Sequence, residues 1–155
     1  MEMEGKQNED KNKISTGLII NREVLNNTIF PAEVKNEIAP TPYYLLIFIS
    51  REDVIKISCF PTQTKSIKKI LIKLEEFSPD IVKGISDILN KLDLSKDILH
   101  TTGICYELEN CFYETYLIGD LIEKDKDFEK KIEKEFLSIP RITSVVLEDI
   151  TIQKV

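Results

Sequence analysis

The chain has 155 residues and a formal net charge of −6, and its apolar share of 42% is typical of globular proteins. This length suits one domain, or a small domain with an attachment, that buries about 70% of its unfolded surface. The negative charge opposes a general affinity for phosphate backbones, so we expect no nucleic-acid partner. Frequent Lys, Glu and Ile with no Trp are typical of thermophiles and also of AT-rich genomes.

The histidine and the cysteines do not have the spacing of a metal site. His100 is the one histidine, and the three cysteines, Cys59, Cys105 and Cys111, form no CxxC motif. Zinc needs four ligands at recognisable spacing, so we expect no metal and no cofactor. An odd number of thiols also argues against a disulfide framework and favours a reducing, cytoplasmic compartment.

Neither the N-terminus nor the longest apolar run indicates a membrane segment. Residues 1–13 are polar, unlike a signal peptide, and are predicted to form a disordered tail. The longest apolar run, residues 43–49, is far shorter than the ~20 residues that a membrane helix needs. We therefore expect no membrane partner.

Residues 14–66 are predicted to form an N-terminal β extension. Two runs of β-branched and aromatic residues flank a short polar turn at residues 51–53, which is the pattern of a hairpin. Three prolines between residues 31 and 42 indicate a loop with one helical turn. The expected elements are a strand at 18–25, a helical turn at 32–37, and hairpin strands at 43–50 and 54–60 that end at Pro61.

Residues 67–155 have a more regular pattern and are predicted to form a second domain. Ile70, Ile72 and Leu74 alternate along residues 69–76, which predicts a strand. The apolar residues that follow recur at helical spacing and predict an amphipathic helix of about three turns. The members of this apolar stripe are Ile81, Ile85, Ile88, Leu89 and Leu92.

Two paired strands, a second helix and a last strand are predicted after this first helix. The paired strands cover residues 98–108 and 111–118 and turn at Glu109 and Asn110. Asp125 is the expected N-cap of the second helix, which ends before Pro140. Its core face consists of Phe128, Ile132 and Phe136, and the last strand covers residues 141–152.

The predicted order over residues 69–152 is therefore β-α-β-β-α-β, which indicates an α+β, ferredoxin-like sandwich. Right-handed crossovers place both helices on one face of an antiparallel sheet. Numbered within this half, the strands are expected in the spatial order 2-3-1-4. The N-terminal β-hairpin extension would lengthen this sheet or cover one of its surfaces.

The turn before the first of these helices allows two interpretations. Ser78 is a favoured N-cap, Pro79 suits the first helical position, and Asp80 places negative charge near the positive end of the helix dipole. These three features explain the turn without any ligand. The same geometry also offers backbone N–H groups that can hold an anion such as a carboxylate.

This turn and the element order resemble the ACT domain family over residues 69–152. The turn of that family often has the sequence Asp-x-Pro-Gly followed by apolar residues. The segment Phe77-Ser78-Pro79-Asp80-Ile81-Val82 keeps the proline and the apolar residues, but it has Phe77 in place of the acid and Asp80 in place of the glycine.

The resemblance implies a regulatory domain that binds an amino acid or another small effector at this turn, often between paired domains. Because the second strand lies near the effector in that family, its residues are also candidates. The implied ligand-binding residues are Glu76, Ser78, Pro79, Asp80, Thr102 and Gly103.

Other residues allow competing interpretations. His100 could act as a base, although no motif links a nucleophile to it. Phe112 and Tyr116 could stack on RNA bases if exposed, but the strand does not match the RNA-binding pattern, so we expect them to be covered. An acylphosphatase-like enzyme would need a basic phosphate loop after the first strand, and residues 75–80 contain no basic residue.

The second strand contains two features with structural interpretations. A turn at Glu109 and Asn110 would place Cys105 and Cys111 on opposite faces, where they could not form a disulfide. Gly103 within a strand pattern indicates a bulge or a close approach by another backbone.

Three hypotheses follow for function. The leading one is a non-catalytic, small-molecule-sensing domain that assembles as a homo-oligomer and transmits its signal to a protein partner. The second is a protein–protein interaction or scaffold module without a ligand. The third is a small enzyme that works through His100 or a thiol.

Overall fold

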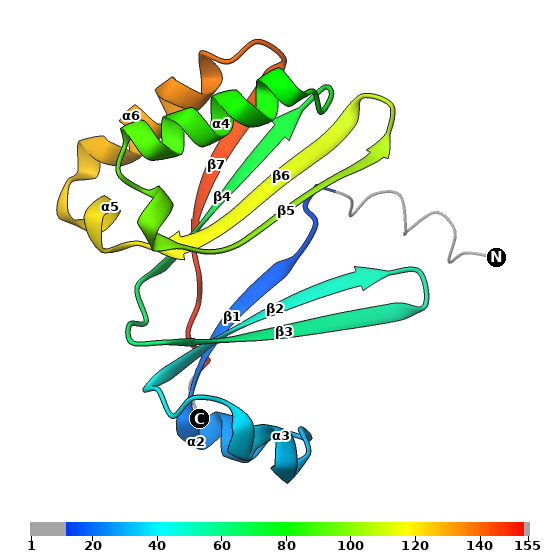
Figure 1. Cartoon of the computed structure of the whole chain (residues 1–155), viewed down its shortest axis with the longest axis vertical. Helices are drawn as coiled ribbons and strands as arrows, with labels where there is room; N and C mark the ends of the chain where they lie inside the picture. The colour runs from blue at the N-terminus through cyan, green and yellow to red at the C-terminus, as the bar shows by residue number, and fades with distance from the viewer. Residues whose placement is uncertain (1–11, 154–155) are drawn as a thin grey trace. The chain divides into compact units, whose positions relative to one another are not determined.

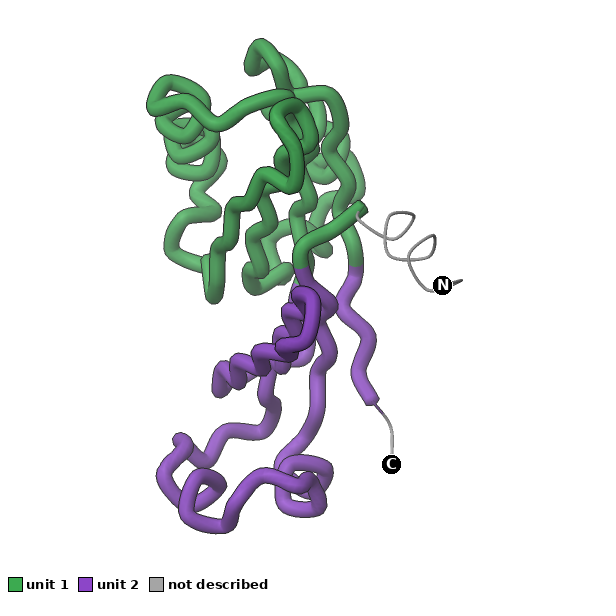
Figure 2. Tube along the Cα trace, turned by 90° about the vertical axis from the view of Figure 1, so that its right-hand side faces the viewer, with its two compact units in different colours: residues 1–14, 68–148 green, residues 15–67, 149–155 purple. Residues whose placement is uncertain are grey.

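A computed structural model describes residues 12–153, and these residues form an α+β fold with one three-stranded and one four-stranded sheet (Figure 1). They divide into two compact units (Figure 2). Unit 1 contains residues 12–14 and 68–148, and unit 2 contains residues 15–67 and 149–153. The disordered tail predicted for residues 1–13 lies almost entirely outside the described residues.

Unit 2 contains the expected hairpin. Strands β1 (Thr16–Asn21), β2 (Tyr43–Arg51) and β3 (Val54–Thr62) form an antiparallel sheet in the order β1-β2-β3. The β2–β3 turn places Glu52 at a φ of 49°, and Arg51 pairs with Val54. The prediction that Pro61 ends the hairpin is wrong, because Pro61 pairs with Tyr44 inside β3. An edge strand tolerates proline where its missing N–H faces away from the neighbouring strand.

Two short helices cover one side of this sheet. The strand predicted at residues 18–25 stops at Asn21, because the Asn21 side chain accepts a hydrogen bond from the Val24 N–H at 2.9 Å and caps α2 (Arg22–Asn26). The helical turn expected at residues 32–37 is confirmed as α3 (Ala32–Glu37). The buried residues of this small core are Ile20, Leu25, Tyr44 and Leu46.

Unit 1 contains the β-α-β-β-α-β element order that the sequence predicted. Strands β4 (Ile67–Leu74), β5 (Ile98–Glu107), β6 (Asn110–Ile118) and β7 (Ile142–Asp149) lie in the order β5-β6-β4-β7. This is the expected spatial order 2-3-1-4. The sequence did not predict the short helices η1 (Ser95–Asp97) and α5 (Asp120–Lys124), which lengthen the connections before β5 and after β6.

Helices α4 (Pro79–Lys91) and α6 (Lys126–Leu137) lie side by side on one face of this sheet (Figure 1). Lys91 Nζ of α4 lies 3.1 Å from Glu135 Oε1 of α6. The apolar stripe predicted for the first helix is buried, as are Ile132 and Phe136 of the second. The Asp125 side chain accepts the Asp127 N–H at 2.9 Å, which confirms the predicted cap.

The last predicted strand is too long. Strand β7 ends at Asp149 rather than at residue 152, and the backbone beyond it pairs with β1 of unit 2. The Ile19 N–H donates to the Thr151 carbonyl at 3.0 Å, and the Gln153 N–H donates to the Ile19 carbonyl at 2.8 Å. A change of pairing partner therefore ends the strand, although the apolar pattern continues.

The expectation that Cys105 and Cys111 cannot form a disulfide is wrong. The two cysteines are directly paired between β5 and β6 and are joined by a disulfide. An irregularity between Cys105 and Glu107 lets Glu107 pair with Asn110, so the turn lies one residue earlier than predicted. One extra residue in a strand reverses which face its side chains occupy. With this disulfide, cysteine usage no longer supports the argument for a reducing compartment.

Candidate functional site

The turn between β4 and α4 is built as a helix cap. Ser78 has an extended backbone, and its Oγ accepts the Ile81 N–H at 3.2 Å. Its carbonyl accepts the Val82 N–H at 3.1 Å. Pro79 has no N–H and the Ile81 N–H is taken by Ser78, so the Asp80 N–H is one of the few backbone donors of the first turn that remain for an anion. The helix-cap geometry that the sequence predicted for these residues is confirmed.

The side chain of Phe77 connects this turn to β5. A Cβ atom added to Gly103 would lie 2.9 Å from Cζ of the Phe77 ring, closer than real Cβ contacts come. Gly103 therefore lies at a close approach, as one of the two interpretations expected, but the approaching group is the end of a side chain rather than a backbone. The structure thus brings Gly103 together with the turn that contains Ser78 and Asp80.

Thr102 lies on the opposite face of β5 from this contact. Neighbouring residues of a strand point to opposite faces, and Gly103 faces the Phe77 ring. Thr102 Oγ1 lies 2.8 Å from Nε2 of His100, which is two residues away on the same face. The structure therefore does not bring Thr102 to the turn. It shows instead a hydroxyl beside His100 that no sequence motif had indicated.

The turn also contacts a cationic side chain, Arg141, which the sequence did not predict to lie there. Arg141 Nη1 lies 2.9 Å from Glu76 Oε2, with the two side chains 56% and 44% exposed. The Arg141 carbonyl also accepts the Glu75 N–H at 3.0 Å, and Arg141 has a φ of 73°. These two segments are distant in the sequence, so only their strand pairing could have indicated the contact. The turn therefore carries a pair of opposite charges that a ligand can reach.

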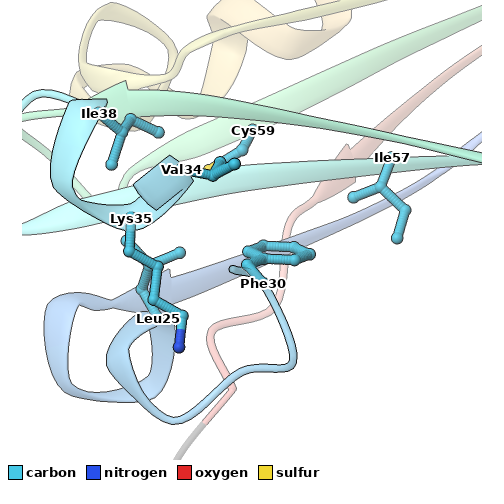
Figure 3. Close-up of a pocket in the computed structure, with 7 residues that line it drawn as sticks. All are labelled: Leu25, Phe30, Val34, Lys35, Ile38, Ile57 and Cys59. Atoms are coloured by element: carbon cyan, nitrogen blue, oxygen red, sulfur yellow. The ribbon is translucent and has the colours of Figure 1, made fainter. Parts of the chain in front are cut away.

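Two hollows elsewhere were not predicted. A cavity of about 210 Å³ lies in unit 2 between α2, α3 and β3 (Figure 3). A more open hollow of about 380 Å³ lies along α6 at Lys130, Lys134 and Leu137. Neither hollow contains a residue of the β4–α4 turn. Among the described residues, no group of three or more His, Cys, Asp or Glu side chains could hold a metal ion.

A buried ion pair lies on the face of the four-stranded sheet away from α4 and α6. Lys69 Nζ lies 3.2 Å from Glu114 Oε2, and the two side chains are 1% and 0% exposed. Glu114 also accepts the Ile14 N–H, and the Lys69 ammonium lies 5.4 Å from the centre of the Tyr116 ring. Tyr116 and Phe112 are buried as well, so these rings offer no exposed stacking surface.

Comparison with known protein families matched no family model, and comparison with curated proteins matched no sequence. In the part of the chain that the structure describes, none of the helices has the length and apolar composition needed to cross a membrane.

Proposed function

We propose that this chain is a non-catalytic regulatory module of the ferredoxin-like, ACT-like type that binds a small zwitterionic effector, such as an amino acid, at the β4–α4 turn. The observation that supports it is the solvent-accessible Glu76–Arg141 ion pair next to the Phe77–Gly103 contact. Charges of both signs beside an apolar contact match the chemistry of an amino acid. The unit 1 strand order and its paired helices support the fold type.

The charged ends of such an effector would each find a partner at this turn. Its carboxylate would replace Glu76 on the planar Arg141 guanidinium, which suits bidentate binding, and would also accept the Asp80 N–H. Its ammonium group would pair with the Glu76 and Asp80 carboxylates. Its side chain would take the place of the partly buried Phe77 ring over Gly103. Thr102 has no role in this arrangement.

Melting temperatures measured with a panel of amino acids test this function. A ligand that binds only the folded state at a hundred times its dissociation constant stabilises it by about 2.7 kcal/mol. For a chain of this size the melting temperature should rise by roughly 5–10 °C. Arg141→Gln and Asp80→Lys should abolish the rise. Lys96→Gln, which breaks an exposed ion pair with Asp93, is the matched control and should keep it.

Shifts that survive both turn variants, or a panel without any shift, would contradict the proposal. The proposal that the chain is non-catalytic is tested at His100, whose ring lies beside the Thr102 hydroxyl. Any turnover that His100→Ala removes while the fold is retained would assign an enzyme activity instead.

Exposed apolar residues on β3 favour a second function, that of a protein interaction module that also assembles as a homo-oligomer. Among the described residues β3 has a neighbouring strand on the β2 side alone. Val54 and Ile55 are 50% and 67% exposed on this edge. Unpaired strand edges add strands from other chains. Light scattering should report an oligomer that Ile55→Lys dissociates, and a monomeric wild-type chain at micromolar concentration would exclude self-assembly.

A further inference from the structure

Side chains from three separate elements, α2, α3 and β3, line the cavity in unit 2. Strand β3 contributes Ile57 and Cys59, which lie on the sheet face that carries α2 and α3. The end of α2 contributes the buried Leu25, and α3 contributes Val34 (Figure 3). The walls are therefore almost entirely apolar, and two of the lining side chains, Val34 and Ile57, are about half exposed to solvent.

One charged side chain, Lys35, lines this cavity. Its Nζ donates to the Asn26 carbonyl at 2.9 Å and to the Thr28 carbonyl at 2.8 Å, so two backbone groups hold the ammonium in place. An ammonium has three N–H donors, and the third remains for a ligand. A positive charge at an apolar wall attracts an anion more strongly than it would in bulk water.

The size of the cavity restricts the occupant. Drug-sized ligands occupy sites of about 300–1,000 Å³, and this cavity measures about 210 Å³. An apolar cavity of about 150 Å³ is large enough to bind benzene. One phenyl ring or one short branched aliphatic group therefore fits, whereas a long acyl chain does not.

We propose that this cavity binds a compact apolar carboxylate, with the carboxylate on the Lys35 ammonium and the hydrocarbon part between Leu25, Ile57 and Cys59. One fixed cation complements the charge of the carboxylate, and the apolar walls match the size of its hydrocarbon part. This site lies in unit 2 and uses none of the residues of the β4–α4 turn. The inference therefore goes beyond the proposed function and does not depend on it.

The thiol of Cys59 provides a direct readout of occupancy. It is the free cysteine of the chain, since Cys105 and Cys111 form the disulfide. Burial raises the pKa of the Cys59 thiol, so labelling with a maleimide should be followed at mildly alkaline pH, where more thiolate forms. Phenylacetate and 4-methylpentanoate are suitable ligands, and the corresponding alcohols are their uncharged controls.

Each carboxylate should slow the labelling of Cys59 by about tenfold at ten times its dissociation constant, because only the unoccupied fraction reacts. The corresponding alcohols should protect much less at the same concentration. In Lys35→Met the carboxylates should protect Cys59 no better than the alcohols do. In Lys35→Arg part of the difference between carboxylates and alcohols should return. Arg141→Gln should leave the protection unchanged, which separates this site from the one at the β4–α4 turn.

Two outcomes would overturn the inference. Equal protection by acid and alcohol would exclude the role of Lys35, and this comparison on the wild-type chain needs no variant to fold. Labelling that no compound slows would show that the cavity is not a ligand site.

Discussion

At the scale of single residues, the contact of Gly103 with Phe77 decides how tightly β5 can pack against the β4–α4 turn. A methyl group on Gly103 would come within 2.9 Å of the Phe77 ring, and the three atoms nearest to that added carbon all belong to this ring. Relief therefore requires the ring to move. The same displacement is what an effector would have to cause at the proposed site.

Gly103→Ala should destabilise the folded chain by about 0.5–1.5 kcal/mol, the usual cost of pushing a side chain away from its preferred rotamer, because the Phe77 ring must move although position 103 itself is exposed. Urea unfolding measures this loss. Phe77→Leu in the same chain should recover most of the loss, because the shorter side chain vacates the space beside the new methyl group. If the stability losses of Gly103→Ala and Phe77→Leu simply add in the double variant, the Phe77 ring is not the cause of the loss at Gly103.

The cross-strand disulfide gives the second prediction at this scale. Cys105 and Cys111 are separated by six positions, and a loop this short gains about 2 kcal/mol of stability from a cross-link in the chain-entropy description. Unfolded protein prepared without reductant should react with one maleimide at Cys59, and reduced protein with three. Three labels before reduction would contradict the bond, and Cys59→Ser should remove the single label.

The sequence predicted local features of single residues and missed the pairings between distant ones. The caps at Ser78 and Asp125 follow from a side chain and the backbone of the next turn, so a few neighbouring residues suffice to predict them. Arg141 reaches Glu76 only after β7 has paired beside β4. Residue type and spacing carry no information about such a contact.

At the scale of elements, the Lys69–Glu114 pair connects β4 to β6 in the interior of the molecule. Glu114→Gln should cost about 3–5 kcal/mol, because it removes the negative charge that faces a buried ammonium group. Glu135→Gln is the matched control at the exposed Lys91 pair between α4 and α6, where about 1 kcal/mol or less is expected. Urea unfolding of both variants gives the comparison, and equal losses would contradict the structural role of the buried pair.

The sequence predicted the type and order of the elements in unit 1 because apolar spacing differs clearly between its strands and helices. It was less accurate where pairing rather than spacing sets the boundary. Strand β7 stops at Asp149 although the apolar alternation continues, and the irregularity near Cys105 moves the β5–β6 turn by one residue. In unit 2 the Asn21 side chain caps α2, so β1 ends at Asn21 although the predicted strand continued to residue 25.

At the scale of the whole molecule, each unit draws on segments from different parts of the chain. Residues 149–153 belong with residues 15–67, whereas residues 12–14 belong with residues 68–148. The sequence predicted a boundary after residue 66 from a change in pattern. The return of the last residues to unit 2 depends on hydrogen bonds to Ile19 that no local pattern encodes.

The proposed function requires that the β4–α4 turn binds a zwitterionic effector. Backbone amide chemical shifts of the isotope-labelled chain test it most directly, recorded while an amino acid that raises the melting temperature is added. The largest saturable changes should occur at Phe77, Asp80, Gly103 and Arg141, and Arg141→Gln should abolish them. Saturable changes centred on other residues, or the absence of any change at this turn, would contradict it.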